Sequence, residues 1–61
     1  AMGQPVEVMA FRKRLRSGGY SNPKIYRISG RDSYLVTAVE PLAGILISVE
    51  LEIYEMCLLF R

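Results

Sequence analysis

The chain has 61 residues, of which 51% are apolar and 23% are charged, and its formal net charge is +2. This length holds one domain, and a domain so small buries only about 60% of its unfolded surface, so its stability is marginal. Cys57 is the only cysteine and histidine is absent. An internal disulfide, a zinc site built from Cys and His, and Ser-His or Cys-His catalysis are therefore excluded. We expect residues 4–61 to form the domain and interpret residues 1–3 as a cloning remnant.

The cellular location and the cofactors of the protein can be predicted only from features that the sequence lacks. The longest stretch without a charged residue is 41–49, far short of the roughly 20 apolar residues that cross a bilayer. The arginines near residue 14 are not followed by the apolar run of a signal peptide, and a single cysteine suits a reducing compartment. The glycines match no nucleotide-binding motif. The sequence predicts a cytoplasmic protein without a membrane span, a metal or a cofactor.

The first segment, residues 6–16, fits two structures. As a strand it places Met9, Phe11 and Leu15 on one face and three arginines on the other (Arg12, Arg14 and Arg16). As a helix it pairs only Phe11 with Leu15 across one turn, which is a weaker apolar stripe. We favour the strand.

The middle of the chain predicts a β-hairpin. Residues 17–23 contain two glycines and an Asn-Pro pair, which are typical of a flexible loop. Residues 24–29 are rich in β-forming types, and the turn that follows contains Gly30 and Asp32. Residues 34–39 carry apolar side chains at odd and even positions, as expected of a central strand that is covered on both faces.

The last segment is ambiguous in its period. Between residues 45 and 54 apolar and polar side chains alternate, as in a strand, but apolar residues also recur at spacings of three and four, as in a helix. The β-branched residues in positions 45–53 favour the strand. The apolar tail at 56–60 is expected to dock, either in the core of its own domain or against a neighbour.

These segments together predict a mainly β fold, a small four-stranded antiparallel meander. Such a meander would close into an SH3-like barrel or pair through its edges in a dimer. The alternative is a β-hairpin plus a C-terminal helix. Because an open sheet leaves two unprotected edges, a homodimer or another homo-oligomer is the expected assembly.

Charge is strongly segregated along the chain. Residues 1–31 contain seven basic residues and one acidic residue, whereas residues 32–61 contain one basic and five acidic residues. Arginines on one strand face would be spaced by roughly 6.6 Å, which suits a row of phosphates. The leading hypothesis is a small, non-enzymatic, all-β module that binds nucleic acid, with Tyr20 or Tyr26 stacking on bases. Its predicted contacts are Arg12, Lys13, Arg14, Arg16, Tyr20, Lys24, Tyr26 and Arg27.

The alternative hypothesis is a protein-interaction or homo-oligomerisation domain, because the apolar content is high for so short a chain. The C-terminal segment would supply the contact through Met56, Leu58, Leu59 and Phe60. Glu50 and Glu52 are interpreted as the solvated face of a strand and not as catalytic carboxylates. The chain is therefore not expected to be an enzyme.

The hairpin segment also resembles part of a known family. Residues 24–40, which begin Lys-Ile-Tyr-Arg-Ile-Ser-Gly-Arg-Asp-Ser-Tyr-Leu-Val-Thr, are similar to the central hairpin of toxin ribonucleases that use Arg, Lys and Tyr in place of His. The leading helical hairpin of that family has no counterpart before residue 24. We therefore do not assign the chain to it.

Overall fold

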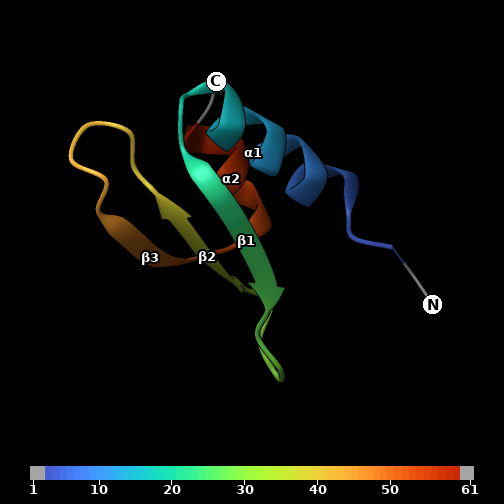
Figure 1. Cartoon of the computed structure of the whole chain (residues 1–61). Helices are drawn as coiled ribbons and strands as arrows, with labels where there is room; N and C mark the ends of the chain where they lie inside the picture. Colours follow the sequence, from blue (N-terminus) through green and yellow to red (C-terminus); the bar gives the residue numbers. More distant parts are fainter. Residues whose placement is uncertain (1–2, 60–61) are drawn as a thin grey trace.

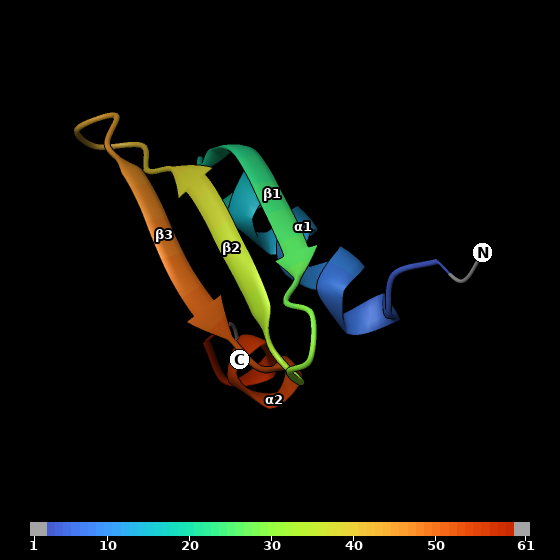
Figure 2. The ribbon, with the colours of Figure 1, turned by 90° about the horizontal axis from the view of Figure 1, so that it is seen from below.

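Two helices cover one face of a three-stranded sheet. The computed structural model describes residues 3–59. The elements in chain order are α1 (Val6–Ser17), β1 (Ser21–Arg27), β2 (Tyr34–Val39), β3 (Leu46–Leu51) and α2 (Ile53–Leu59). The sheet is antiparallel with strand order β1-β2-β3, and both helices lie on the same side of it (Figures 1 and 2).

The prediction of a mainly β, four-stranded meander is wrong, and so is the all-β class. The segment 6–16 is a helix, and within the segment 45–59 residues 46–51 form a strand and residues 53–59 a second helix. Neither the SH3-like barrel nor a hairpin with one C-terminal helix describes this arrangement. The fold is a mixed one in which helices are packed on a single antiparallel sheet.

Helix α1 forms because its apolar residues recur at helical spacing. Val8, Phe11 and Leu15 are three and four positions apart, and all three are buried. The helix alternative paired only Phe11 with Leu15 and omitted Val8, which completes the stripe. Lys13, which disrupts the alternating pattern of a strand, is accommodated on a helix. Glu7 in the first turn and arginines in the last turn complement the helix dipole.

Helix α1 ends in a Schellman motif, in which the amide of Gly19 donates to the carbonyl of Arg16 and the amide of Tyr20 donates to the carbonyl of Leu15. Gly19 has φ +91°, and a Cβ there would lie 3.2 Å from Pro41. Glycine is therefore favoured at position 19 for two reasons, the positive φ of the backbone and the close approach of the loop after β2.

The predicted hairpin is confirmed and β2 is the central strand, but the predicted coverage of both its faces is wrong, since Leu35, Thr37 and Val39 lie on the open face. The Ile28 amide donates to the carbonyl of Ser33 at the closed end. The predicted loop at 17–23 is shorter than expected, because β1 already begins at Ser21. A bulge near Asn22, which has φ +52°, shifts the register there.

Strand β3 and helix α2 explain why both periods were visible near the C-terminus. The alternating apolar residues are those of β3, and some of the apolar residues spaced by three and four are those of α2. The change occurs at Glu52, whose amide donates to the Glu55 carboxylate at 2.8 Å and so begins the helix. Met56 then points into the core and is only 2% exposed.

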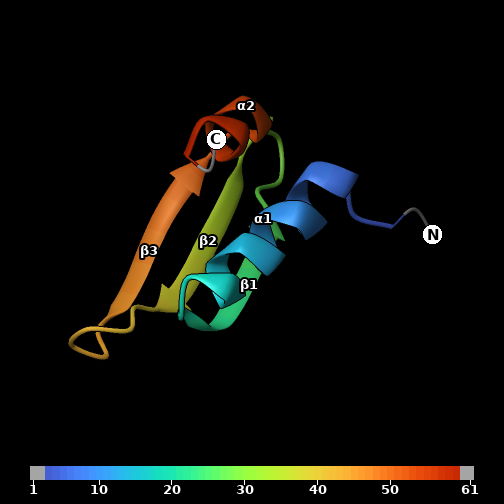
Figure 3. The same ribbon diagram turned by 90° about the horizontal axis from the view of Figure 1, so that it is seen from above.

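The core lies between the helices and the inner face of β1, β2 and the last residue of β3. It consists of Val8, Phe11, Leu15, Ile25, Tyr34, Val36, Leu51 and Met56. Figure 3, seen from the helix side, shows α1 lying along β1 and α2 lying across one end of the sheet. Most of β3 has no helix above it.

The loop between β2 and β3 is organised by one carboxylate. Glu40 accepts hydrogen bonds from the amides of Leu42, Ala43 and Ile45 at 2.7, 2.8 and 3.1 Å. These amides, that of Ile45 first, lower the pKa of Glu40 below its ordinary value. The loop therefore keeps one shape although Leu42 at its tip is 97% exposed.

Two valines near the start of α1 test the helix directly. Val8 is buried and Val6 is 72% exposed, whereas a strand would put both on the same face. Val8→Ala is expected to lower the free energy of unfolding by roughly 2 kcal/mol, through lost burial and a cavity. Val6→Ala is the matched control, because it gains the same helix propensity without losing core contacts, and should stay within about 0.5 kcal/mol. Equal losses in urea denaturation would contradict the helix.

The Glu40 contacts predict a pH dependence. A carboxylate whose pKa is lowered by folding stabilises the protein above its unfolded pKa, and this contribution is lost as the pH falls through the folded value. The wild-type chain should therefore lose stability below about pH 4.5, the ordinary value. Glu40→Gln should be less stable at neutral pH and should lose less on acidification. Thermal melts from pH 7 to pH 3 measure this.

The control for that experiment is Glu52→Gln, because the Glu52 carboxylate accepts no hydrogen bond from the residues that the structure describes. It removes the same charge without opening the loop. If both variants have the same pH profile, the loop contacts do not produce the effect.

Candidate nucleic-acid interface

The basic residues of α1 are distributed by helical geometry. Arg12 and Arg16 are one turn apart, and Arg16 lies between Arg12 and Lys13 around the helix axis, about 40° from Arg12 and about 60° from Lys13. Lys13 and Arg16 are exposed and Arg12 is half-buried at the margin of the core face. These three side chains form one continuous face, here called the basic face of α1. The predicted strand row of Arg12, Arg14 and Arg16 is wrong, because a helix does not place alternate residues together.

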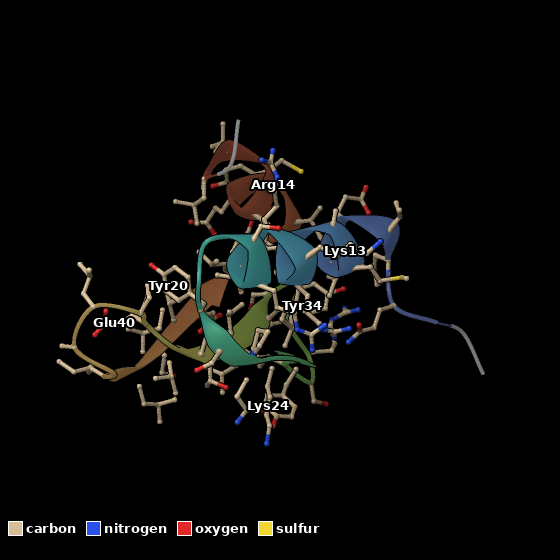
Figure 4. The ribbon with its side chains drawn as sticks, turned by 45° about the horizontal axis from the view of Figure 1, so that its top comes forward. Lys13, Arg14, Tyr20, Lys24, Tyr34 and Glu40 are labelled. Atoms are coloured by element: carbon tan, nitrogen blue, oxygen red, sulfur yellow. The ribbon has the colours of Figure 1, made fainter. Side chains whose placement is uncertain are left out.

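Arg14 lies on the other side of α1. Together with Glu7, Phe11, Met56 and Cys57 it lines a shallow depression between α1 and α2. Figure 4 shows Arg14 extending towards α2, away from Lys13. Arg14 therefore belongs to the junction of the two helices and is not part of the basic face.

Lys24 and Tyr26 lie on the opposite side of the sheet from the helices. They alternate with the buried Pro23 and Ile25 along β1, so their side chains project from the open face. Figure 4 shows Lys24 on this far side. Tyr20 is placed differently again, because it is half-buried beside Leu15. The structure therefore does not bring either tyrosine to the basic face of α1.

Arg27 and Arg31 are committed to contacts at the hairpin. The Arg27 guanidinium lies 5.7 Å from the centroid of the Tyr34 ring and 3.4 Å from Asp32. Arg31 lies 3.2 Å from the carboxylate of Glu50, which also accepts a 2.6 Å hydrogen bond from Ser33. The Ser33 hydroxyl, and with it Arg31, lowers the pKa of Glu50. Both pairs are exposed, so each is worth little energy, but each reduces the local charge.

Gln4 connects the basic face to this end of the sheet. Its side-chain oxygen accepts a 2.6 Å hydrogen bond from Arg12, and its amide nitrogen donates to the carbonyl of Ile25 at 3.4 Å. Gln4 also lines a shallow pocket of about 240 Å³ with Arg27 and Tyr34. The guanidinium of Arg12 is thus held against β1, and the positive surface continues from α1 towards Arg27.

Acidic side chains lie elsewhere. Glu40 is in the β2–β3 loop, Glu50 is on β3, and Glu52 and Glu55 are at the start of α2. Glu7, the only acidic residue of α1, lines the depression beside Arg14 and Met56. Negative charge therefore lies at both ends of the sheet, with Glu40 at the β2–β3 loop and the other carboxylates near α2, whereas the basic face of α1 contains positive side chains.

The predicted interface residues of the C-terminal segment are separated by the structure. Met56 is in the core, Leu58 and Leu59 are 50% and 60% exposed, and Phe60 lies outside the described residues. Leu59 borders an open apolar groove of about 250 Å³ between the helices and β3. Its other lining residues are Phe11, Leu15, Tyr20, Val36, Ile47, Val49 and Leu51.

No metal-binding group of three or more His, Cys, Asp or Glu side chains occurs within residues 3–59. Over the same range, neither helix is long and apolar enough to cross a bilayer. No known protein family matches the chain, and neither a curated protein nor a solved structure matches it. Any function proposed for the chain must therefore be inferred from the geometry of the described residues.

Sequence reasoning missed two uncharged residues that contact the arginines, Gln4 beside Arg12 and Tyr34 beside Arg27. Gln4 lies outside any recognisable pattern, so no sequence signal identifies it. Tyr34 lies opposite Arg27 because β1 ends at Arg27, whereas the predicted strand continued to Ser29 and so did not indicate this pair.

Proposed function

We propose that this protein is a small nucleic-acid-binding module that contacts the phosphate backbone through the basic face of α1. The observation that carries the proposal is the position of Arg12, Lys13 and Arg16 on one side of a helix whose acidic residue lies on another side. Lysine and arginine side chains so placed neutralise phosphates and release counterions.

The helix supports this role in a way that the predicted strand could not. Its buried stripe, Val8, Phe11 and Leu15, fixes the rotation of α1 on the sheet, so the basic face is held outward. Lys13 and Arg16 are long, exposed and one turn apart, and Arg12 is oriented by Gln4. Three positive charges are thus presented on a rigid helix, so binding a phosphate backbone costs little conformational entropy.

The same features favour binding without sequence preference. Base readout requires side chains that fit donor and acceptor patterns in a groove, whereas phosphate contacts carry no sequence information. The basic face contains charged side chains only, with Met9 as its apolar neighbour on the helix surface. The proposed activity is therefore electrostatic association with nucleic acid that weakens steeply with salt.

Two double variants with the same net charge test the proposal. Lys13→Gln/Arg16→Gln removes two charges from the basic face, and Arg14→Gln/Lys24→Gln removes two from elsewhere. Fluorescence anisotropy with single- and double-stranded oligonucleotides would give the slope of log K against log salt. The first variant should lower the magnitude of that slope by about 2, because each lost phosphate contact contributes about 1. The second should leave it near the wild-type value.

Two results would contradict the proposal. One is the absence of binding by the wild-type protein at low salt, with any oligonucleotide. The other is an equal loss in both double variants, which would mean that net charge and not the face of α1 governs association. Circular dichroism of each variant confirms that the helix is intact.

A further inference from the structure

Strand β3 has a free edge whose hydrogen-bonding groups can be assigned. The amide of Glu40 donates to the carbonyl of Ile45, so this pair is of the hydrogen-bonded type in the β2–β3 ladder. Since pair types alternate along an antiparallel ladder, Ile47, Val49 and Leu51 direct their amides and carbonyls towards β2. The amides and carbonyls of Leu46, Ser48 and Glu50 therefore point away from the sheet.

This edge lacks the devices that usually prevent strand pairing. The sequence of β3 is Leu-Ile-Ser-Val-Glu-Leu, with no proline, no lysine and no bulge in its register. Its single charge, Glu50, is already paired with Arg31 and Ser33 of the same chain. A neighbouring strand would therefore pair with an edge that is uninterrupted by a bulge and carries one carboxylate, which is already paired.

The apolar surface beside the edge is also incompletely covered. Ile47 and Val49 face the helix side, because their partners Ala38 and Val36 are buried there. Val49 nevertheless remains 42% exposed and forms one wall of the apolar groove. Figure 3 shows no helix above this part of β3.

We propose that a second copy of this chain occupies the edge, with the two β3 strands antiparallel and their two-fold axis at Ser48. In that register Leu46, Ser48 and Glu50 are opposite Glu50, Ser48 and Leu46 of the second copy. Each of these three opposed pairs exchanges two backbone hydrogen bonds. The two sheets become one continuous sheet of six strands.

The side chains of this register are compatible on both faces. On the helix side, Ile47 lies opposite Val49 of the second copy, an apolar pair of β-branched residues. On the open face, the two Glu50 carboxylates are four residues apart along the strands, roughly 13 Å, so their repulsion is largely screened. A register centred on Glu50 would place the two carboxylates directly opposite each other. The charge pattern therefore excludes a centre at Glu50, and only a centre at Ser48 lets all three outward-directed residues of β3 form pairs.

The second copy is favoured as the occupant by symmetry and by surface area. A two-fold axis perpendicular to the sheet keeps both helix layers on the same side, so the two apolar grooves meet across the axis. The chain exposes 4482 Å², against about 4,000 Å² for a compact monomer of its mass. The surface of one copy is thus about 500 Å² larger than that of a compact chain, as expected if part of the molecule is covered only by a partner. The inference does not depend on nucleic-acid binding.

A charge exchange at Ser48 tests the proposal. Ser48→Lys and Ser48→Glu each place like charges opposite each other at the axis, so each purified variant should be a monomer by analytical ultracentrifugation where the wild-type chain is a dimer. An equimolar mixture of the two variants should restore the dimer as a heterodimer. Restoration by mixing identifies residue 48 as self-opposed, which general destabilisation of the chain could not do.

Controls keep the result interpretable. Ser48 is exposed and its amide points outward. Both charged variants should therefore have the melting temperature that the wild-type chain shows when it is diluted to a monomer. Ser48→Thr should remain dimeric. The proposal is overturned if the wild-type chain stays monomeric up to its solubility limit. It is also overturned if either charged variant alone still dimerises, or if the mixture of folded variants stays monomeric.

Discussion

The packing of α1 on the inner face of the sheet is the contact on which the rest of the molecule depends. Val8 is fully buried and Val36 is 1% exposed, so helix and sheet meet with little room for rotation. This contact decides which residues of α1 remain outside. Arg12, Lys13 and Arg16 share a surface because the opposite side of the helix is occupied, and a helix that was free to turn would present no fixed charge pattern.

The same contact leaves the sheet unevenly covered. Helix α1 lies along β1, and α2 is only seven residues long and lies across one end. The inner face of β1 and β2 is therefore shielded, whereas β3 keeps an open groove and a free edge. The positive helix and the bare strand are two consequences of where a small number of apolar side chains can be buried.

The sequence predicted the parts of the fold that depend on local turn chemistry. Gly30 lies in the turn of the expected hairpin, and β2 has apolar residues of both parities because its open face carries Leu35 and Val39. The helix α1 was missed because its stripe has only three members, while its arginines happen to alternate. Tertiary burial of Val8 decided between the two periods, and burial of a single residue is not visible in the sequence.

The charge distribution along the sequence predicted which half of the chain contains the candidate site, and the structure corrected which basic residues lie together. The basic half of the chain contains the residues of the basic face, but the strand interpretation grouped Arg14 with them and left Lys13 as an exception. The helix reverses both assignments. Near the C-terminus two periods overlap, and their boundary depends on the hydrogen bond between the Glu52 amide and the Glu55 side chain. No run of residue types marks that boundary, so neither period alone could locate it.

The order of the elements also has a consequence for how the chain folds. Each strand pairs with its neighbour in sequence, and α1 packs on β1, which follows it directly. Such contacts close short loops and form quickly. The contact between α1 and α2 is different, because it joins the two ends of the chain and brings Met56 into a core that the sheet has already begun. Helix α2 is therefore expected to dock last, and its docking converts a set of local structures into one cooperative unit.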